Sequence, residues 1–433
     1  MLTNPVVLSV IVMTVLCLLR LNVILSLIVA ALVGGVAAGM PIGETMGVLV
    51  GGMGGNAETA LSYILLGALA AAIAKSGAAD VLALKIAQMI KGKSIVLLVV
   101  LAFVACLSGT VIPIHIAFIP ILIPPLLPLM NKMGLDRRAA ASALAFGLKA
   151  PYITLPIGYG LIYHNIIRDQ MTLSGMEITT DMVWRSNWIA GLAMLTGLII
   201  ALVVYRKKRE YHTVELEGHK IVDLDEKVVI TRQHYAALAA GIVAIAVQLK
   251  FGSMPLGALS GLTFMLLARV IEWRHLEDML TGGIKLMGMI AFVMLVAAGY
   301  AAVMRATGGV ETLVAASSAA ISSKFMGATI MILMGLVITM GIGTSFGTIP
   351  IIAAIYVPLA QSLGFSVQAT ILLIAVAAAL GDAGSPASDT TLGPTAGLNA
   401  DGQHDHIWDT CVPTFLCYNI PLVIFGIIGA VIL

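Results

Sequence analysis

Two carboxylates in an otherwise apolar stretch are the strongest chemical signal in this sequence. Asp382 and Asp389 lie within residues 381–397, GDAGSPASDTTLGPTAG. Four hydroxyl residues stand beside them: Ser385, Ser388, Thr390 and Thr391. Carboxylate and hydroxyl oxygens are hard ligands that suit Na⁺ better than a soft metal, and a membrane-buried carboxylate can also carry a proton. We therefore expect ion binding here, with Asp382 and Asp389 as Na⁺ ligands; the alternative is a polar surface loop.

One lysine also interrupts an apolar run. Lys149 follows the segment AASALAFGL and lies in a second broken stretch, residues 147–160, GLKAPYITLPIGYG. A buried lysine either pairs with an acid or gives up its proton. Lys149 therefore predicts a pair with a buried carboxylate whose charge state changes. The alternatives are a static salt bridge and a lysine that reaches out to the membrane interface.

Further polar breaks supply more candidate ligands. Residues 108–115 and 341–350 combine Gly, Pro and hydroxyl residues, a composition typical of unwound helices or hairpins. The candidates are Ser108, Thr110, His115, Thr344, Ser345 and Thr348. His115 is a possible proton carrier or a satisfied core histidine. The cluster DGQHDHIWD, residues 401–409, suits a solvated loop better than a metal site or a pH sensor.

The elements that must position these residues are membrane helices. The chain is 60% hydrophobic and 11% charged, with a mean hydropathy of +1.04, whereas soluble domains carry about 25% charged residues. The net charge of +2 is too small to indicate a nucleic-acid partner. The motif HExxH is absent and no filter-like loop repeats, and we expect neither an enzyme nor a channel.

Apolar segments near the spanning length of about 20 residues divide into seven in each half of the chain, separated by a polar stretch at 206–233. If each segment crosses the membrane once, most Lys and Arg residues lie on the same side of the membrane as that stretch. The excess predicts that the stretch is a cytoplasmic linker and that both termini lie outside.

The two halves resemble each other. Residues 119–135, IPILIPPLLPLMNKMGL, match residues 349–365, IPIIAAIYVPLAQSLGF, and prolines coincide at two positions, 120 with 350 and 128 with 358. A similar offset places Lys149 opposite Asp382. An odd number of spans per copy inverts the second copy, and inverted repeats are typical of secondary transporters, whose site lies at the repeat interface. Chance similarity between apolar helices is the alternative.

The stretch GDAGSPASDTTLGPTAGLNADGQHDHIWDTC and the N-terminal TNPVVLSVIVM resemble the Na⁺/H⁺ antiporter-type branch of the ion transporter superfamily. The resemblance implies an all-α membrane protein with two inverted repeats, discontinuous helices and re-entrant hairpins. It also implies a scaffold that forms a homodimer and a transport part that moves like an elevator. The expected parts are a first repeat at 1–205 (scaffold about 1–92, transport part about 93–205), the linker at 206–233, and a second repeat at 234–433 (scaffold about 234–325, transport part about 326–433).

We therefore expect a multi-pass protein of the cell inner membrane that performs ion-coupled secondary transport. The first expectation is a Na⁺/proton antiporter with alternating access. The alternative is a Na⁺- or H⁺-coupled permease for an amino acid or small organic acid, because two polar breaks offer helix ends for a carboxylate and acids for an amine. No cofactor is expected beyond the coupling ion, Na⁺ or H⁺. The expected partners are membrane lipid and the small substrate.

Overall fold

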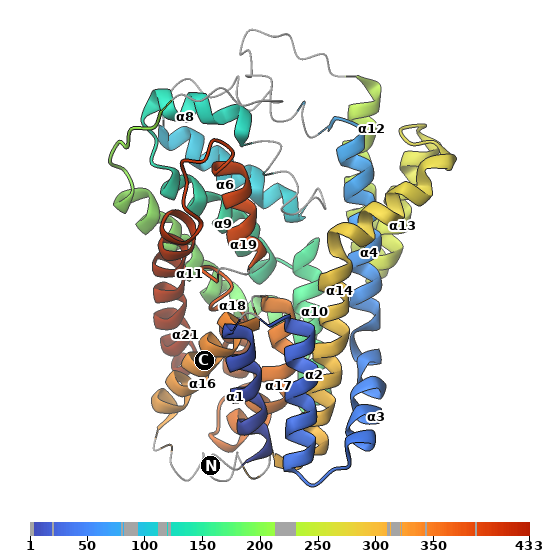
Figure 1. Ribbon diagram of the computed structural model, residues 1–433, viewed down its shortest axis with the longest axis vertical. Coiled ribbons are helices and arrows are strands. Elements are labelled where there is room, and N and C mark those ends of the chain that lie inside the picture. Colours follow the sequence, from blue (N-terminus) through green and yellow to red (C-terminus); the bar gives the residue numbers. More distant parts are fainter. Residues whose placement is uncertain are drawn as a thin grey trace.

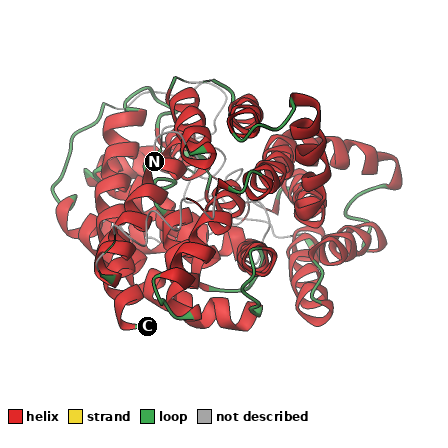
Figure 2. Ribbon diagram, turned by 90° about the horizontal axis from the view of Figure 1, so that it is seen from below, coloured by secondary structure: helices red, strands yellow, loops and turns green. Residues whose placement is uncertain are grey.

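A computed structural model of the chain consists of helices and loops, with no strand in the residues that it describes (Figure 2). These residues are 4–19, 21–78, 81, 94–110, 119, 123–212, 231–309, 312, 321, 323–342, 344–385 and 388–433. Within them, the side chain of Asp389 is not described. The predicted all-α class is confirmed.

The described helices of the first half follow the apolar segments closely. They are α1 (Pro5–Leu18), α2 (Val23–Ala37), α3 (Ile42–Gly52), α4 (Ala57–Lys75), α6 (Ser94–Thr110), α8 (Leu127–Met133), α9 (Arg137–Thr154), α10 (Tyr159–Leu173) and α11 (Thr180–Val204). Two 3-10 turns, Met53–Asn56 and Pro124–Leu126, precede α4 and α8.

The second half is also helical. Its helices are α12 (Arg232–Phe251), α13 (Met254–Leu267), α14 (Leu276–Ala306), α16 (Lys324–Ile342), α17 (Ser345–Ser362), α18 (Val367–Ala379), α19 (Asp389–Leu398), α20 (Val412–Thr414) and α21 (Ile420–Ile432). A 3-10 turn, Trp273–His275, precedes α14. Two π-helical segments, His406–Cys411 and Phe415–Asn419, join α20 and α21 into one apolar helix over His406–Ile432.

Helix length limits how many elements can cross a bilayer. Three described helices are long and apolar enough: Thr180–Val204, Ser345–Ser362 and His406–Ile432. Two bent pairs raise this number to five, and one of them is Arg137–Thr154 with Tyr159–Leu173, bent by 46°. Other apolar helices have 10–17 residues. The prediction of one full crossing per apolar segment is therefore too simple, because several segments are half-length or broken.

Helices from the two halves pack side by side. In Figure 1, α1 and α2 occupy the lower part of the molecule, while α12 and α13 occupy the upper right. Helix α14 contacts both α2 and α4, and α4 also contacts α13. At the α4–α14 crossing, a Cβ on Gly283 would lie 2.4 Å from the Ala68 nitrogen. The missing side chain allows the close backbone approach that membrane helices use in place of a hydrophobic driving force.

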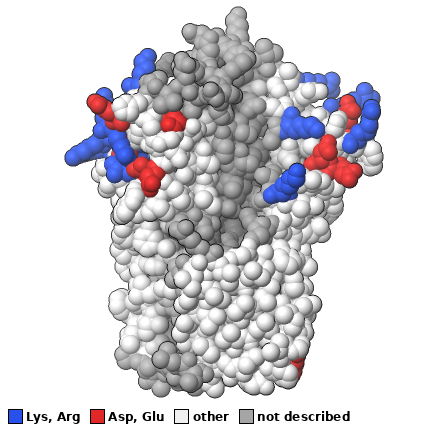
Figure 3. Space-filling model, viewed as in Figure 1, with Lys and Arg blue, Asp and Glu red and all other residues white. Residues whose placement is uncertain are grey.

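Charged side chains gather at one end of the molecule. Figure 3 shows Lys, Arg, Asp and Glu near the top of this face, while the middle and lower parts expose almost no charge. Helix α11 ends and α12 begins at the charged end (Figure 1). An uncharged belt below a charged end is the surface that a bilayer requires.

Candidate functional site

The carboxylate of Asp382 lies at the centre of a buried polar cluster. The residue is 5% exposed. Its Oδ2 accepts hydrogen bonds from the Tyr152 hydroxyl at 2.7 Å and from Ser345 Oγ at 2.7 Å. Its Oδ1 accepts from Ser388 Oγ, and the Thr390 hydroxyl donates to its backbone carbonyl at 3.0 Å. The carboxylate thus accepts hydrogen bonds from three hydroxyl groups.

Lys149 approaches the same carboxylate from the first half of the chain. Its Nζ lies 3.9 Å from Asp382 Oδ2, and its hydrogen bond goes to the Ala379 carbonyl. The lysine is fully buried. The predicted lysine–carboxylate pair is therefore present as a charge contact, without a direct hydrogen bond between the ammonium and the carboxylate.

The loop that carries Asp382 turns sharply at two glycines. Gly381 has φ +77° and Gly384 has φ +110°, a backbone region that side chains rarely adopt. A Cβ on Gly381 would also lie 2.7 Å from the Met340 nitrogen. The loop is held from α21 by Asn419, which donates to the Ala383 carbonyl at 3.0 Å and accepts from the Gly381 N–H at 3.3 Å. Asn419 ends a π-helical segment, a feature often found at functional sites.

The first-half break lies between α9 and α10. Pro151 removes a backbone donor inside α9, which ends at Thr154. Gly158 then reverses the chain with φ +59°, and a Cβ there would lie 2.4 Å from the Gly109 carbonyl oxygen of α6. Gln248 of α12 donates to the Gly158 carbonyl at 3.2 Å. The end of α6, the break and α12 therefore meet at one point.

Aromatic rings cover the side of the site next to α17. The Phe346 ring follows Ser345 and lies 5.1 Å from the Tyr152 ring centroid, 5.6 Å from Tyr163 and 5.8 Å from Tyr63. Tyr63 also lies 6.0 Å from Tyr159. These rings come from α4, α9, α10 and α17, so four elements are joined beside Asp382.

Two further buried polar residues secure the end of α9. His164 Nε2 lies 2.9 Å from the Ile153 carbonyl oxygen, and Asn187 Nδ2 donates to the same oxygen at 3.1 Å. A carbonyl only accepts, so His164 is protonated on Nε2. Both side chains are fully buried. They cap a carbonyl that the break leaves without a helical donor, and this holds the α9 turn that bears Tyr152.

The structure distributes the other predicted site residues as follows. Thr110, Thr348 and Thr391 donate to nearby backbone carbonyls. Thr344 is half-buried at the start of α17, and Ser108 and Ser385 are buried. Asp389 is the first residue of α19, and His115 lies outside the described residues. Lys149, Ser345 and Ser388 are the predicted residues that contact the Asp382 side chain.

Sequence reasoning missed Tyr152, His164, Asn187, Phe346 and Asn419. One signal was available for Tyr152, because it follows Lys149 by three positions and so shares its helix face. No such signal was available for the others. Nothing local shows that His164 and Asn187 bind the Ile153 carbonyl, that Asn419 binds Gly381 or that Phe346 contacts Tyr152.

Residues 401–409 form an ion-paired cluster, and the prediction of a solvated loop holds for only part of it: Asp405 and Trp408 are exposed, whereas His404 and Asp409 are buried. Asp401 accepts two hydrogen bonds from the buried Arg137 at 2.6 and 2.5 Å. Asp409 pairs with Arg209 at 2.6 Å, and His404 Nε2 lies 2.6 Å from the Thr410 hydroxyl. Among the described residues, no group of His, Cys, Asp and Glu could hold a metal ion.

Comparisons with known proteins agree with this architecture. Residues 143–427 match the sequence model of the "Na+/H+ antiporter family", and residues 4–90 match that of a second "Na+-H+ antiporter family". An uncharacterized membrane protein of Vibrio parahaemolyticus is 50% identical over 99% of this chain and 100% of its own length. The Bacillus subtilis protein described as "Putative amino acid transporter YuiF" is 46% identical over 99% of this chain and 100% of its own length.

Two solved structures share the fold. The YdaH transporter of Alcanivorax borkumensis superposes with a TM-score of 0.60 at 14% identity, covering 89% of this chain and 86% of its own. MtrF of Neisseria gonorrhoeae, whose structure is described as illuminating a class of antimetabolite efflux pumps, superposes with a TM-score of 0.60 at 16% identity, covering 89% and 83%. At these identities the likeness concerns the fold alone.

Proposed function

Because this chain belongs to the Na⁺/H⁺ antiporter family and is a membrane transporter rather than an enzyme, we propose that it exchanges a cation for a proton at Asp382. One observation carries the proposal. The buried Asp382 carboxylate has three hydroxyl donors and a lysine ammonium at 3.9 Å. An ionised group at this depth is costly, and it is retained where transport needs it.

The exchange follows from charge. One buried carboxylate compensates one cation, so Na⁺ and a protonated Lys149 cannot both remain beside Asp382 without a large desolvation cost. When Na⁺ binds to the carboxylate and the hydroxyl oxygens, the Lys149 ammonium releases H⁺ and becomes a neutral amine. The reverse step expels Na⁺ as Lys149 regains its proton. Each step moves one positive charge in and one out, so the charge of the site is unchanged.

An inverted repeat is part of the proposal. Lys149 contacts Asp382, its equivalent in the second half, and Tyr152 donates to Asp382 across a separation of 230 residues. Equivalent residues of two repeats touch only where they lie near the symmetry axis. The packing of α2 on α14, mirrored by α13 on α4, supports the same relation. A site on that axis suits alternating access, because either half can then open it.

An elevator-like movement would take place where α4 and α12 meet the broken segments. The contacts there are the Tyr63–Phe346 and Tyr63–Tyr159 ring pairs and the hydrogen bond of 3.2 Å from Gln248 to Gly158. Sliding of one part against the other would exchange these apolar ring contacts without separating an ion pair among them.

The direct test is proton release on Na⁺ addition. The chain is reconstituted into liposomes with a pH-sensitive dye, and Na⁺ is stepped at several values between about pH 6 and 9. We expect proton movement in the native chain. Lys149→Met should keep Na⁺ binding and lose the coupled proton. Lys250→Met, at an exposed lysine, is the matched control. Absence of Na⁺-dependent proton movement in the native chain at all pH values would exclude antiport.

A second function is favoured by the ring cluster. Four tyrosines and Phe346 beside one carboxylate offer apolar and cation–π contacts for an organic ammonium, which a bare Na⁺ does not need. A relative with 46% identity is described as a putative amino acid transporter. Ion-coupled amino-acid transport therefore competes with antiport. Thermal melting with amino acids, with and without Na⁺, separates them: a shift that needs both favours the permease, and a shift with Na⁺ alone favours the antiporter.

A further inference from the structure

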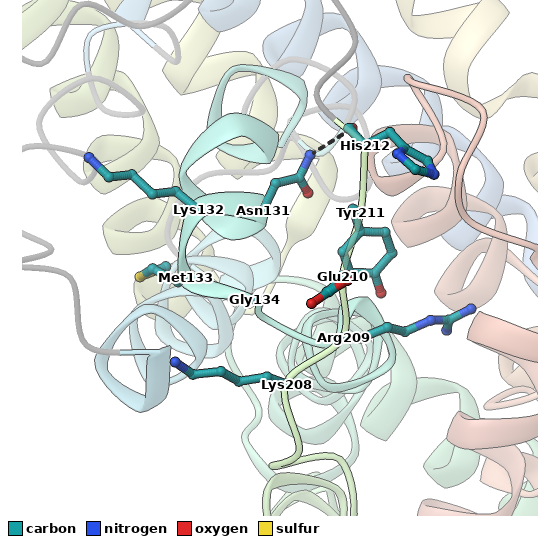
Figure 4. A pocket seen from close by; sticks show the side chains of 9 residues that line it. All are labelled: Asn131, Lys132, Met133, Gly134, Lys208, Arg209, Glu210, Tyr211 and His212. Atoms are coloured by element: carbon teal, nitrogen blue, oxygen red, sulfur yellow. Dashed lines mark hydrogen bonds between the residues drawn. The ribbon is translucent and has the colours of Figure 1, made fainter.

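A polar cavity opens at the charged end of the molecule, away from Asp382. It has a volume of about 490 Å³ and lies between the end of α8 and the segment that follows α11. Lys132, Gly134, Lys208 and Glu210 are among its lining residues (Figure 4). The Arg209 N–H donates to the Gly134 carbonyl at 3.0 Å and fixes this segment against the α8–α9 turn. The walls are therefore held by a backbone contact.

Two lysines supply the positive charge of the cavity. Lys132 comes from the last turn of α8. The Lys208 stem crosses Gly134, where an added Cβ would lie 3.3–3.4 Å from three of its carbons. Figure 4 shows the two side chains extending on the same side of the cavity, with Met133 between them. Within the described part of the chain, neither ammonium forms a salt bridge.

The neighbouring arginines are already neutralised. Arg137 pairs with Asp401 and Arg209 pairs with Asp409. Glu210 is the one carboxylate among the cavity residues. Two lysines against one glutamate leave the cavity with a positive charge, and the acids that could have balanced it are held by the arginines.

The position of the cavity is that of a membrane interface. It lies where the apolar helix Thr180–Val204 has just ended, at the charged end seen in Figure 3. Basic pockets beside membrane helices attract anionic headgroups, at about 1 kcal/mol for each Lys or Arg near the surface. An ammonium pair around an apolar Met133 suits an anion that also carries apolar chains.

We propose that this cavity binds a phosphate group, carried by an anionic phospholipid headgroup or by free phosphate. Lys132 and Lys208 are the two cationic contacts, and Glu210 weakens the binding by its like charge. The site is independent of Asp382, so its test does not depend on the transported substrate.

The test compares two double variants that remove the same charge. Lys132→Gln with Lys208→Gln removes the cavity lysines, and Arg206→Gln with Lys207→Gln removes two exposed neighbours that do not line it. Retention of phosphatidylglycerol over phosphatidylcholine is measured on the full purified chain by native mass spectrometry. We expect the cavity variant to lose about 30-fold in affinity and the neighbour variant to keep it. An equal loss in both would reduce the effect to diffuse charge and overturn the site.

Two more arms complete the test. Glu210→Gln should strengthen retention, because it removes the one negative charge of the cavity; weaker retention would contradict the assignment. Thermal melting with inorganic phosphate identifies the source. If phosphate raises the melting temperature of the native chain but not of the cavity variant, the ligand is free phosphate. If phosphate has no such effect but the native chain retains phosphatidylglycerol selectively, the ligand is the lipid headgroup. A native chain with neither response has no such site. Lys132, Lys208, Arg206 and Lys207 are all exposed, so the two double variants should melt as the native chain does.

Discussion

Two buried acid–base pairs in the described part of the chain are built differently. Lys149 and Asp382 stand 3.9 Å apart in the middle of the fold, with hydroxyls rather than the ammonium bonded to the carboxylate. Arg137 and Asp401, at the charged end, share two hydrogen bonds of 2.6 and 2.5 Å. Both cationic side chains are fully buried.

The difference teaches what each pair is for. A guanidinium is always charged and matches a carboxylate with a rigid fork, whereas a lysine ammonium is a point charge that can lose its proton when buried. The Arg137–Asp401 pair therefore holds segments together. Under the proposed exchange, the Asp382 carboxylate keeps its hydroxyl partners whichever cation is beside it, and the Lys149 charge is the one exchanged.

The largest expected effect comes from removing the exchangeable acid. Asp382→Asn should reduce coupled transport to the level of empty vesicles while the protein still folds, because the amide keeps the shape and loses the charge. Asp389→Asn is predicted to do the same. Uptake and dye assays in liposomes, with size-exclusion profiles as the folding check, measure this. Normal transport in either variant would remove that residue from the mechanism.

Breaking the structural pair should act on stability instead. Arg137→Gln leaves Asp401 buried without its partner, which costs about 3–5 kcal/mol. Arg137→Lys should restore only part of this, since the fork is lost. Thermal melting in detergent measures both variants. Should Arg137→Gln melt normally but transport poorly, the contrast between the two pairs would be reversed.

Tyr152 sharpens the comparison within the site. Tyr152→Phe removes one hydrogen bond to the Asp382 carboxylate, worth about 1.5–3 kcal/mol for a charged acceptor. We expect weaker Na⁺ dependence of transport, together with a lower melting temperature that reflects the lost hydrogen bond. Tyr163→Phe, which loses a hydroxyl bonded to the Ala375 carbonyl, is the matched control. Equal changes in both variants would show that the ring cluster, not the carboxylate contact, is being perturbed.

The charged end should also respond to acid. Burial lowers the pKa of His404 to about 4, below its usual 6.5. The unfolded chain therefore binds a proton first as pH falls, and stability present above pH 6.5 is lost between 6.5 and 4, at up to about 1.4 kcal/mol per pH unit. Below that range Asp401 adds to the loss: burial raises its pKa, but the Arg137 hydrogen bonds outweigh this and lower it. In His404→Gln, the melting temperature should therefore depend less on pH between 6.5 and 4 than it does in the native chain.

The smallest effect is expected at an exposed pair. Arg185 and Asp181 are 2.9 Å apart and more than half exposed. Arg185→Gln should change stability by about 0.5 kcal/mol or less. A larger shift in melting would mean that distance alone, rather than burial, sets the strength of ion pairs in this protein.

Part of this picture could be predicted and part could not. Lys149 and the 381–397 stretch stood out because ionisable residues are rare in apolar sequence, and the structure places Lys149 beside Asp382. The ion pairs of the 401–409 cluster could not be predicted, because its partners, Arg137 and Arg209, are far away in sequence. His164 was missed for a different reason: its partner, the Ile153 carbonyl, is near in sequence but is free only because α9 ends there.

By itself, the sequence determined that this is a helical membrane protein with broken helices and buried charges, because composition and local Gly and Pro content decide those properties. Only the tertiary structure decided which groups meet. Tyr152, Ser345 and Ser388 converge on Asp382 because α9, α17 and the 381–388 loop pack together. Such contacts join residues up to 230 positions apart. They depend on helix packing geometry, which no local pattern encodes.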